Sequence, residues 1–185
     1  DMRATLETLG LACLVGLAQA AAGAVGLGRR FALSAPFDAA PWTLVTSVYA
    51  HASVGHLLAN ALALGLVGPL VERRTTRLRF HAFVVATGGL AGVGQVVASG
   101  LVGPGAAVLG LSGAVFALGG YVLTGNKVAD TAVGRLSPRT QLGRFGGVAV
   151  LGTLLTAAPG VALVAHATGA TCGLLAGRAR VLDVR

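Results

Sequence analysis

Long stretches without a charged side chain dominate the sequence. Four of them cover residues 8–28, 39–71, 80–126 and 145–177, and they are 21, 33, 47 and 33 residues long. A helix needs about 20 apolar residues to cross the hydrocarbon core of a bilayer. The first stretch therefore predicts one spanning helix, and the third predicts two that are separated by a glycine-rich turn near residues 100–110.

The other two stretches contain turn signals. Residues 39–71 begin with a polar, proline-containing segment and leave room for one span, whereas Ala157-Ala158-Pro159-Gly160 divides residues 145–177 into two short spans. The pattern predicts an all-α, polytopic bundle of six transmembrane helices in a single domain over residues 1–185. The expected spans cover residues 8–28, 54–71, 80–99, 112–125, 144–158 and 161–177.

The composition agrees with a membrane protein. Hydrophobic residues make up 55% of the chain and charged residues 11%, whereas a soluble domain carries about 25% charged residues. This balance excludes an ordinary water-soluble domain and a disordered chain. The sequence Ala18-Gln19-Ala20 resembles a signal-peptide cleavage site. The apolar stretch continues beyond it to Leu27, however, so a retained first helix is the favoured interpretation.

The placement of the basic residues that give the net charge of +8 indicates how the chain is oriented in the membrane. Basic residues concentrate on the cytoplasmic side of membrane proteins, and six spans with both termini in the cytoplasm leave only Arg29 and Arg30 outside. Contact with anionic lipid headgroups accounts for the basic clusters without a nucleic-acid partner. The twelve basic residues predicted inside are Arg3, Arg73, Arg74, Arg77, Arg79, Lys127, Arg135, Arg139, Arg144, Arg178, Arg180 and Arg185.

A few polar residues interrupt the predicted spans, and such residues are functional candidates in a membrane protein. All of them fall in the outer half of the membrane, because the spans that carry them enter from the outer face. His56 and Asn60 are four residues apart and so share one helix face. The five polar positions are His51, His56, Asn60, Ser112 and His166.

The span that begins at Ser112 is short. Its 13 residues reach roughly 20 Å, against a hydrocarbon core of about 30 Å, so Ser112 is expected roughly 10 Å below the outer surface. The preceding loop should dip inward with it. Glycines on the fourth and sixth spans predict close helix packing that brings Ser112 beside His166. These glycines are Gly113, Gly119, Gly120, Gly169 and Gly173.

A serine beside a histidine can act as a nucleophile with its general base. None of the six acidic residues falls in the outer half of a span, so the sequence predicts a Ser112–His166 dyad without a carboxylate. Phe116, one turn after Ser112, is the expected aromatic contact of His166. His56, Asn60 and the Ser112 backbone N–H are the expected donors to an oxyanion.

These residues resemble the rhomboid family of intramembrane serine proteases. The likeness rests on His51, His56 and Asn60 in the second span, on Gly110-Leu111-Ser112-Gly113, and on His166, Gly169 and Gly173 in the sixth span. Trp42 resembles the tryptophan of the family's first loop. The resemblance implies that Ser112 attacks a peptide bond of a transmembrane substrate, with His166 as its base and His56, Asn60 and the Ser112 backbone as the oxyanion site. It also implies a multi-pass protein of a prokaryotic cell membrane whose active site opens to the outer face.

Three departures from the family pattern stand out. Thr43 follows Trp42 where an arginine is usual, Phe116 replaces a tyrosine, and the loop over residues 157–161 is short. The two span-2 histidines lack the HExxH pattern and a nearby carboxylate, so neither a metal nor another cofactor is expected. The alternative function is a non-catalytic rhomboid-like protein that binds transmembrane helices, although such relatives typically lack the serine or the histidine.

Overall fold

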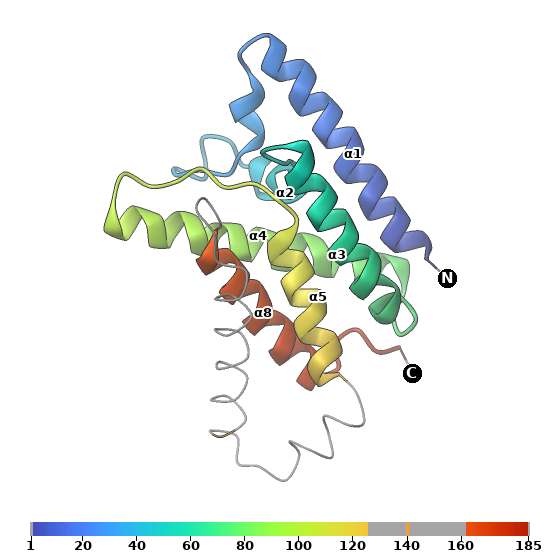
Figure 1. The fold of residues 1–185 in the computed structure, drawn as a ribbon. Coiled ribbons are helices and arrows are strands. Elements are labelled where there is room, and N and C mark those ends of the chain that lie inside the picture. Colours follow the sequence, from blue (N-terminus) through green and yellow to red (C-terminus); the bar gives the residue numbers. More distant parts are fainter. Residues whose placement is uncertain (1, 126–139, 141–161, 185) are drawn as a thin grey trace.

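The computed structural model describes residues 2–125, 140 and 162–184. Within them the regular structure is helical apart from one isolated β-bridge between Leu33 and Val108, which confirms the all-α class for this part of the chain (Figure 1). The predicted span over residues 144–158 and the loop over residues 157–161 lie outside the described residues. The elements are α1 (Arg3–Ala24), the 3-10 helix η1 (Gly28–Phe31), α2 (Thr43–Tyr49), α3 (Val54–Glu72), α4 (Arg77–Val102), α5 (Ser112–Thr124) and α8 (Leu163–Arg178).

Three of the described helices, α1, α3 and α4, are long and apolar enough to cross a membrane. α3 and α5 begin at residues 54 and 112, where the sequence places the start of a span, and α8 covers Leu163–Arg178 where 161–177 is expected. α5 is apolar but short, with 13 residues. The described part of the chain is therefore an apolar helical bundle of the kind found in integral membrane proteins.

The ends of α1 and α4 differ from the predicted spans 8–28 and 80–99. α1 starts at Arg3 because the Glu72 carboxylate accepts hydrogen bonds from the N–H groups of its first turn. It ends at Ala24, just before Gly26 with a φ of +78°. α4 runs over Arg77–Val102, and its first turn contains arginines because their long side chains let the charge reach water while the helix continues.

Helix α2 is an element that the sequence does not predict, because its stretch is polar and contains proline. Its side chains nevertheless bury against α4. A Cβ on Gly88 would lie 2.8 Å from the Cγ1 of Val48, and one on Gly89 would lie 3.2 Å from the carbonyl oxygen of Leu44. The small residues of α4 thus allow the short, half-polar helix α2 to pack against α4, next to the α1–α2 connection (Figure 1).

α5 and α8 run parallel in backbone contact. A Cβ added to Gly169 would lie 2.0 Å from the carbonyl oxygen of Gly113, and one added to Gly173 would lie 1.9 Å from that of Ala117. Both contacts advance by one turn in the same direction along each helix, so the two N-terminal ends lie together. The close packing that these glycines predict is thus seen in the structure, whereas Gly119 has nothing within 4 Å of its Cβ position.

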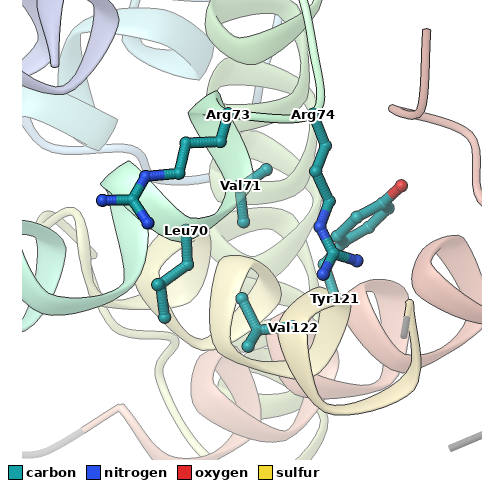
Figure 2. Close-up of a pocket in the computed structure, with 6 residues that line it drawn as sticks. All are labelled: Leu70, Val71, Arg73, Arg74, Tyr121 and Val122. Carbon is teal, nitrogen blue, oxygen red and sulfur yellow. The ribbon is translucent and has the colours of Figure 1, made fainter. Parts of the chain in front are cut away.

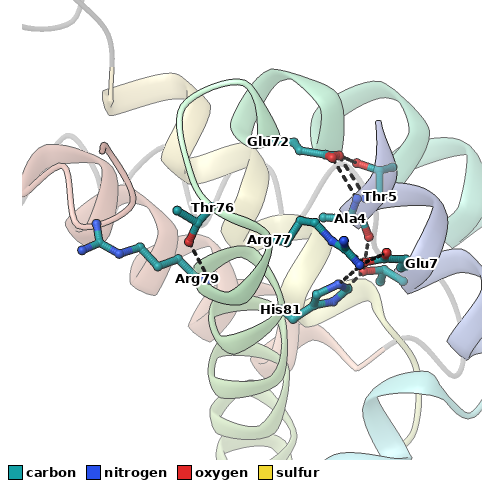
Figure 3. Close-up of polar contacts among 9 residues, drawn as sticks. Ala4, Thr5, Glu7, Glu72, Thr76, Arg77, Arg79 and His81 are labelled. Atoms are coloured by element: carbon teal, nitrogen blue, oxygen red, sulfur yellow. Dashed lines mark hydrogen bonds and ion pairs between the residues drawn. The ribbon is translucent and has the colours of Figure 1, made fainter. Parts of the chain in front are cut away.

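Hydrogen bonds tie the start of α1 to the end of α3 at one end of the bundle (Figure 3). The Glu72 carboxylate, at the end of α3, binds the backbone N–H groups of Ala4 and Thr5 at 2.8 and 3.0 Å. The N–H of Val184 donates to the carbonyl oxygen of Arg74 at 3.0 Å. We call this the basic end, because it carries the arginines Arg3, Arg73, Arg74, Arg77, Arg79, Arg178 and Arg180.

Candidate active site

The first turn of α3 fixes the positions of His56 and Asn60. Ser53 is the N-cap of this helix, and its hydroxyl oxygen accepts a hydrogen bond of 3.1 Å from the backbone N–H of His56. One turn further, the Nδ2 group of Asn60 donates to the carbonyl oxygen of His56 at 3.1 Å. The predicted alignment of His56 and Asn60 on one helix face is therefore seen in the structure.

The segment before α5 lies against His56. The backbone N–H of Gly110 donates to the carbonyl oxygen of Ser47 in α2 at 2.8 Å. Gly110 has a φ of +126°, and a Cβ on it would lie 2.6 Å from the Cε1 atom of His56. Both the backbone conformation and the space favour glycine here. The N-terminal ends of α3 and α5 thus meet at His56 and Gly110, next to Ser112.

His166 lies in the first turn of α8, where its ring stacks on Phe116. The ring centroids are 4.3 Å apart with an interplanar angle of 18°, and His166 is buried. Phe116 follows Ser112 by one turn of α5, so the stack holds the imidazole beside the helix that Ser112 begins. The expected contact between Phe116 and His166 is present.

Two hollows open near these residues. A small cavity of about 10 Å³ is bordered by Gly110, Ser112 and Ala165. A larger cleft of about 580 Å³ is lined by residues that include His56 and Gln95. Ser112 itself is half-buried. The larger cleft therefore has room for water beside His56 and Gln95.

His51 lies between α2 and α3 and packs edge-on against His56, with ring centroids 5.1 Å apart. Its Nδ1 contacts the carbonyl oxygen of Tyr49 at 2.9 Å, so Nδ1 carries the proton. Its Nε2 is buried and has no hydrogen-bond partner among the described residues. Burial, followed by the neighbouring His56, lowers the pKa of His51 from 6.5 to about 4. His51 is therefore neutral at pH 7 and supports His56 by packing.

Trp42, the candidate first-loop tryptophan, connects η1 to α2. Its indole ring is half-exposed, and Nε1 donates to the carbonyl oxygen of Arg30 in η1 at 3.2 Å. The residue is the N-cap of α2, so it ties η1 to the start of that helix. No described contact joins Trp42 to Ser112 or His166.

Gln95 is a polar residue of α4 that the sequence reasoning missed. Its side-chain oxygen accepts hydrogen bonds from the backbone N–H groups of Val164 and Ala165, at 2.9 and 3.2 Å. It therefore caps the first turn of α8, which carries His166. A signal was available, because an amide in the middle of an apolar span needs a buried partner. Gln19 of α1 similarly accepts the N–H of His51 at 3.1 Å.

Three of the described carboxylates are engaged at the basic end. Glu7 pairs with Arg77 and contacts His81, and Glu72 caps α1. Asp183 accepts a hydrogen bond of 2.7 Å from the Tyr121 hydroxyl. Among the residues that the structure describes, no group of three His, Cys, Asp or Glu side chains is placed to hold a metal ion.

A comparison with protein families finds a match over most of the chain. The family model described as the Rhomboid domain matches residues 38–182. The matched range contains the segments around His56, Ser112 and His166. No curated protein matches the chain.

Proposed function

Because the chain belongs to the rhomboid family, whose members are generally serine intramembrane proteases, we propose that it is an intramembrane serine endopeptidase. It cleaves transmembrane segments of membrane proteins near the outer face of the bilayer. Ser112 is the nucleophile and His166 is the general base.

The stacking of His166 on Phe116 is the observation that carries this proposal. A catalytic base needs a fixed ring orientation, and a carboxylate usually provides it. Here the ring of Phe116 lies 4.3 Å from that of His166, on the same helix as Ser112. Phe116 therefore connects the nucleophile and the base, because it lies on the same helix as Ser112 and stacks on His166. Aromatic packing thus takes the orienting role that a third polar residue has in a triad.

The reaction follows from these groups. His166 removes the proton from the Ser112 hydroxyl as its oxygen attacks the carbonyl carbon of the scissile bond. The tetrahedral intermediate collapses to an acyl-enzyme when the C–N bond breaks, and His166 returns the proton to the departing amine. A water molecule, deprotonated by His166, then attacks the ester and releases the new carboxyl group. The cleft of about 580 Å³ beside His56 offers the path for that water.

Donors for the oxyanion come from α3 and α5. The backbone N–H of Ser112 stands at the positive N-terminal end of α5. One amide hydrogen of Asn60 is used in its bond to the carbonyl of His56, which leaves the second for a substrate oxygen. The contact between His56 and Gly110 holds the imidazole at the segment that precedes Ser112. Preorganised donors of this kind stabilise the charge that develops in the transition state.

We place the basic end in the cytoplasm and the candidate active site toward the outer face, within a fold of six spans. The described arginines of the basic end outnumber Arg29 and Arg30, which lie with η1 near the opposite ends of α1 and α3. Basic residues favour the cytoplasmic side. The substrate scissile bond then reaches Ser112 from the outer leaflet.

The test uses the purified full chain in detergent or liposomes. It should cleave a helical model substrate and react with a fluorophosphonate at Ser112. Ser112→Ala and His166→Ala should each lower cleavage by about 10³-fold or more. Ser34→Ala, which changes an exposed serine outside the proposed catalytic set, should leave cleavage intact.

The result also separates the enzyme from a non-catalytic helix-binding relative. Cleavage and labelling that persist unchanged in both the Ser112→Ala and His166→Ala variants would contradict the dyad. A wild-type chain that binds the substrate helix but neither cleaves it nor reacts with the probe would identify the non-catalytic alternative.

A further inference from the structure

A third hollow lies at the basic end, far along α3 and α5 from the candidate active site. It has a volume of about 290 Å³ and sits between the end of α3 and the last turns of α5. Figure 2 shows the side chains of Arg73 and Arg74 on its two sides, with Leu70, Val71 and Val122 between them. The hollow, which we call the arginine cleft, thus combines two cationic groups with an apolar floor. Its lining residues are Leu70, Val71, Arg73, Arg74, Tyr121 and Val122.

The positive charge of the arginine cleft is not neutralised within the described chain. Arg74 donates to the carbonyl oxygen of Gly125, and neither Arg73 nor Arg74 has a carboxylate within ion-pair distance among the described residues. The acids at this end have other partners, since Glu7 pairs with Arg77 and Glu72 caps α1. Two guanidinium groups are therefore left to bind an anion from outside the chain.

The apolar part of the cleft continues along the outside of α3. Four exposed leucines follow one another at intervals of four residues, so they form one ridge on the helix surface. The ridge ends at Leu70, which lines the arginine cleft. The hydroxyl of Tyr121 is engaged by Asp183, so its ring contributes apolar surface. The leucine ridge consists of Leu58, Leu62, Leu66 and Leu70.

We propose that the arginine cleft binds an anionic phospholipid. Arg73 and Arg74 hold the phosphate group, and an acyl chain lies along the leucine ridge. Basic pockets between transmembrane helices are sites for such headgroups. A zwitterionic lipid would bring a second positive charge to the arginines, and a free phosphate would leave the apolar floor and ridge uncovered. The proposal does not depend on proteolytic activity.

Native mass spectrometry of the delipidated full chain in detergent tests this site. With phosphatidylglycerol added, the wild type should retain one lipid that phosphatidylcholine does not replace. Arg73→Gln should weaken retention about fivefold, which is the effect expected for one basic residue at a lipid headgroup. Arg79→Gln removes an exposed charge at the same end but outside the cleft, so it is the matched control and should retain the lipid.

Two further arms identify the ligand. Leu70→Gln leaves the charge unchanged and should weaken the retention of phosphatidylglycerol. Free sn-glycerol 1-phosphate at millimolar concentration should not displace the bound lipid. Equal retention by the wild type, Arg73→Gln and Arg79→Gln would overturn the site, as would equal retention of phosphatidylcholine. If glycerol phosphate displaces the lipid fully and Leu70→Gln has no effect, the proposal of a lipid ligand is wrong and the site binds a soluble phosphate instead. Circular dichroism of each variant checks that its helices are intact.

Discussion

Gln95 shows how one side chain of α4 sets the geometry of α8. Its oxygen accepts the N–H groups of Val164 and Ala165, directly before His166. Gln95→Leu removes this acceptor at nearly constant volume and should destabilise the first turn of α8 by about 1 kcal/mol. Under the proposed function, kcat for cleavage should fall while KM changes little, because the substrate contacts are retained.

Gln95→Glu is the matched variant for this prediction. It keeps a side-chain oxygen that can accept the two N–H groups, and its negative charge is also favourable at the N-terminal end of α8. Its kcat should recover toward that of the wild type. A Leu variant with normal kcat, or a Glu variant as impaired as the Leu variant, would show that Gln95 does not act through α8.

His51 gives a second prediction at the scale of one residue. Its folded-state pKa is about 4 while its ordinary value is 6.5, because it is buried next to His56. The unfolded chain therefore takes up the proton first, and the stability that neutral His51 provides is present above pH 6.5 and lost as the pH falls toward 4. Between pH 7 and pH 5 the loss should be about 2 kcal/mol.

The comparison with His51→Asn isolates this contribution. The Asn side chain can still donate to the Tyr49 carbonyl but does not titrate. Unfolding followed by circular dichroism in detergent at pH 7, 6 and 5 should show a weaker pH dependence for the variant. Parallel curves for the two proteins would mean that His51 is not the titrating group.

At the scale of elements, the contact between α5 and α8 depends on glycine at specific positions. A methyl group on Gly169 would lie 2.0 Å from the carbonyl oxygen of Gly113. Gly169→Ala should therefore push the helices apart, destabilise the fold by about 1–3 kcal/mol or more, and reduce cleavage by separating Ser112 from His166.

Gly119→Ala is the control on the same helix pair. The Cβ position of Gly119 has no neighbour within 4 Å, so the substitution should stabilise α5 by about 0.5–1 kcal/mol through helix propensity. Thermal unfolding of the two variants in one detergent measures both effects. Equal effects of the two substitutions would show that the backbone contact does not determine the packing.

For the whole molecule, the distribution of arginines predicts orientation. Arg30 lies in η1, and Arg79 lies at the basic end in the first turn of α4. In a background with Cys13→Ala and Cys172→Ala, Arg30→Cys should react with a membrane-impermeant maleimide in intact cells. Arg79→Cys should react only after permeabilisation. The reverse pattern would contradict the proposed orientation, with both termini in the cytoplasm.

The sequence alone determined the apolar helices and the order of the polar positions along them. Charge-free stretches predict where α1, α3, α4, α5 and α8 lie, because the bilayer excludes charge. The spacing of His56 and Asn60 fixes their common face, because the helix repeat is local. The predicted helix bounds are wrong where a residue far away in the sequence determines the end of a helix. Glu72 of α3, for example, extends α1 to Arg3.

Only the tertiary structure decided which groups meet. The stack of Phe116 on His166, the contact of Gly110 with His56 and the cap that Gln95 provides for α8 all join residues that are far apart in the sequence. α2 could not be predicted either, since packing against the small residues of α4 offsets its weak helical signal. The length of a charge-free stretch identifies each of these helices, but the register between helices arises from side-chain packing and buried hydrogen bonds, which involve pairs of positions far apart in the sequence.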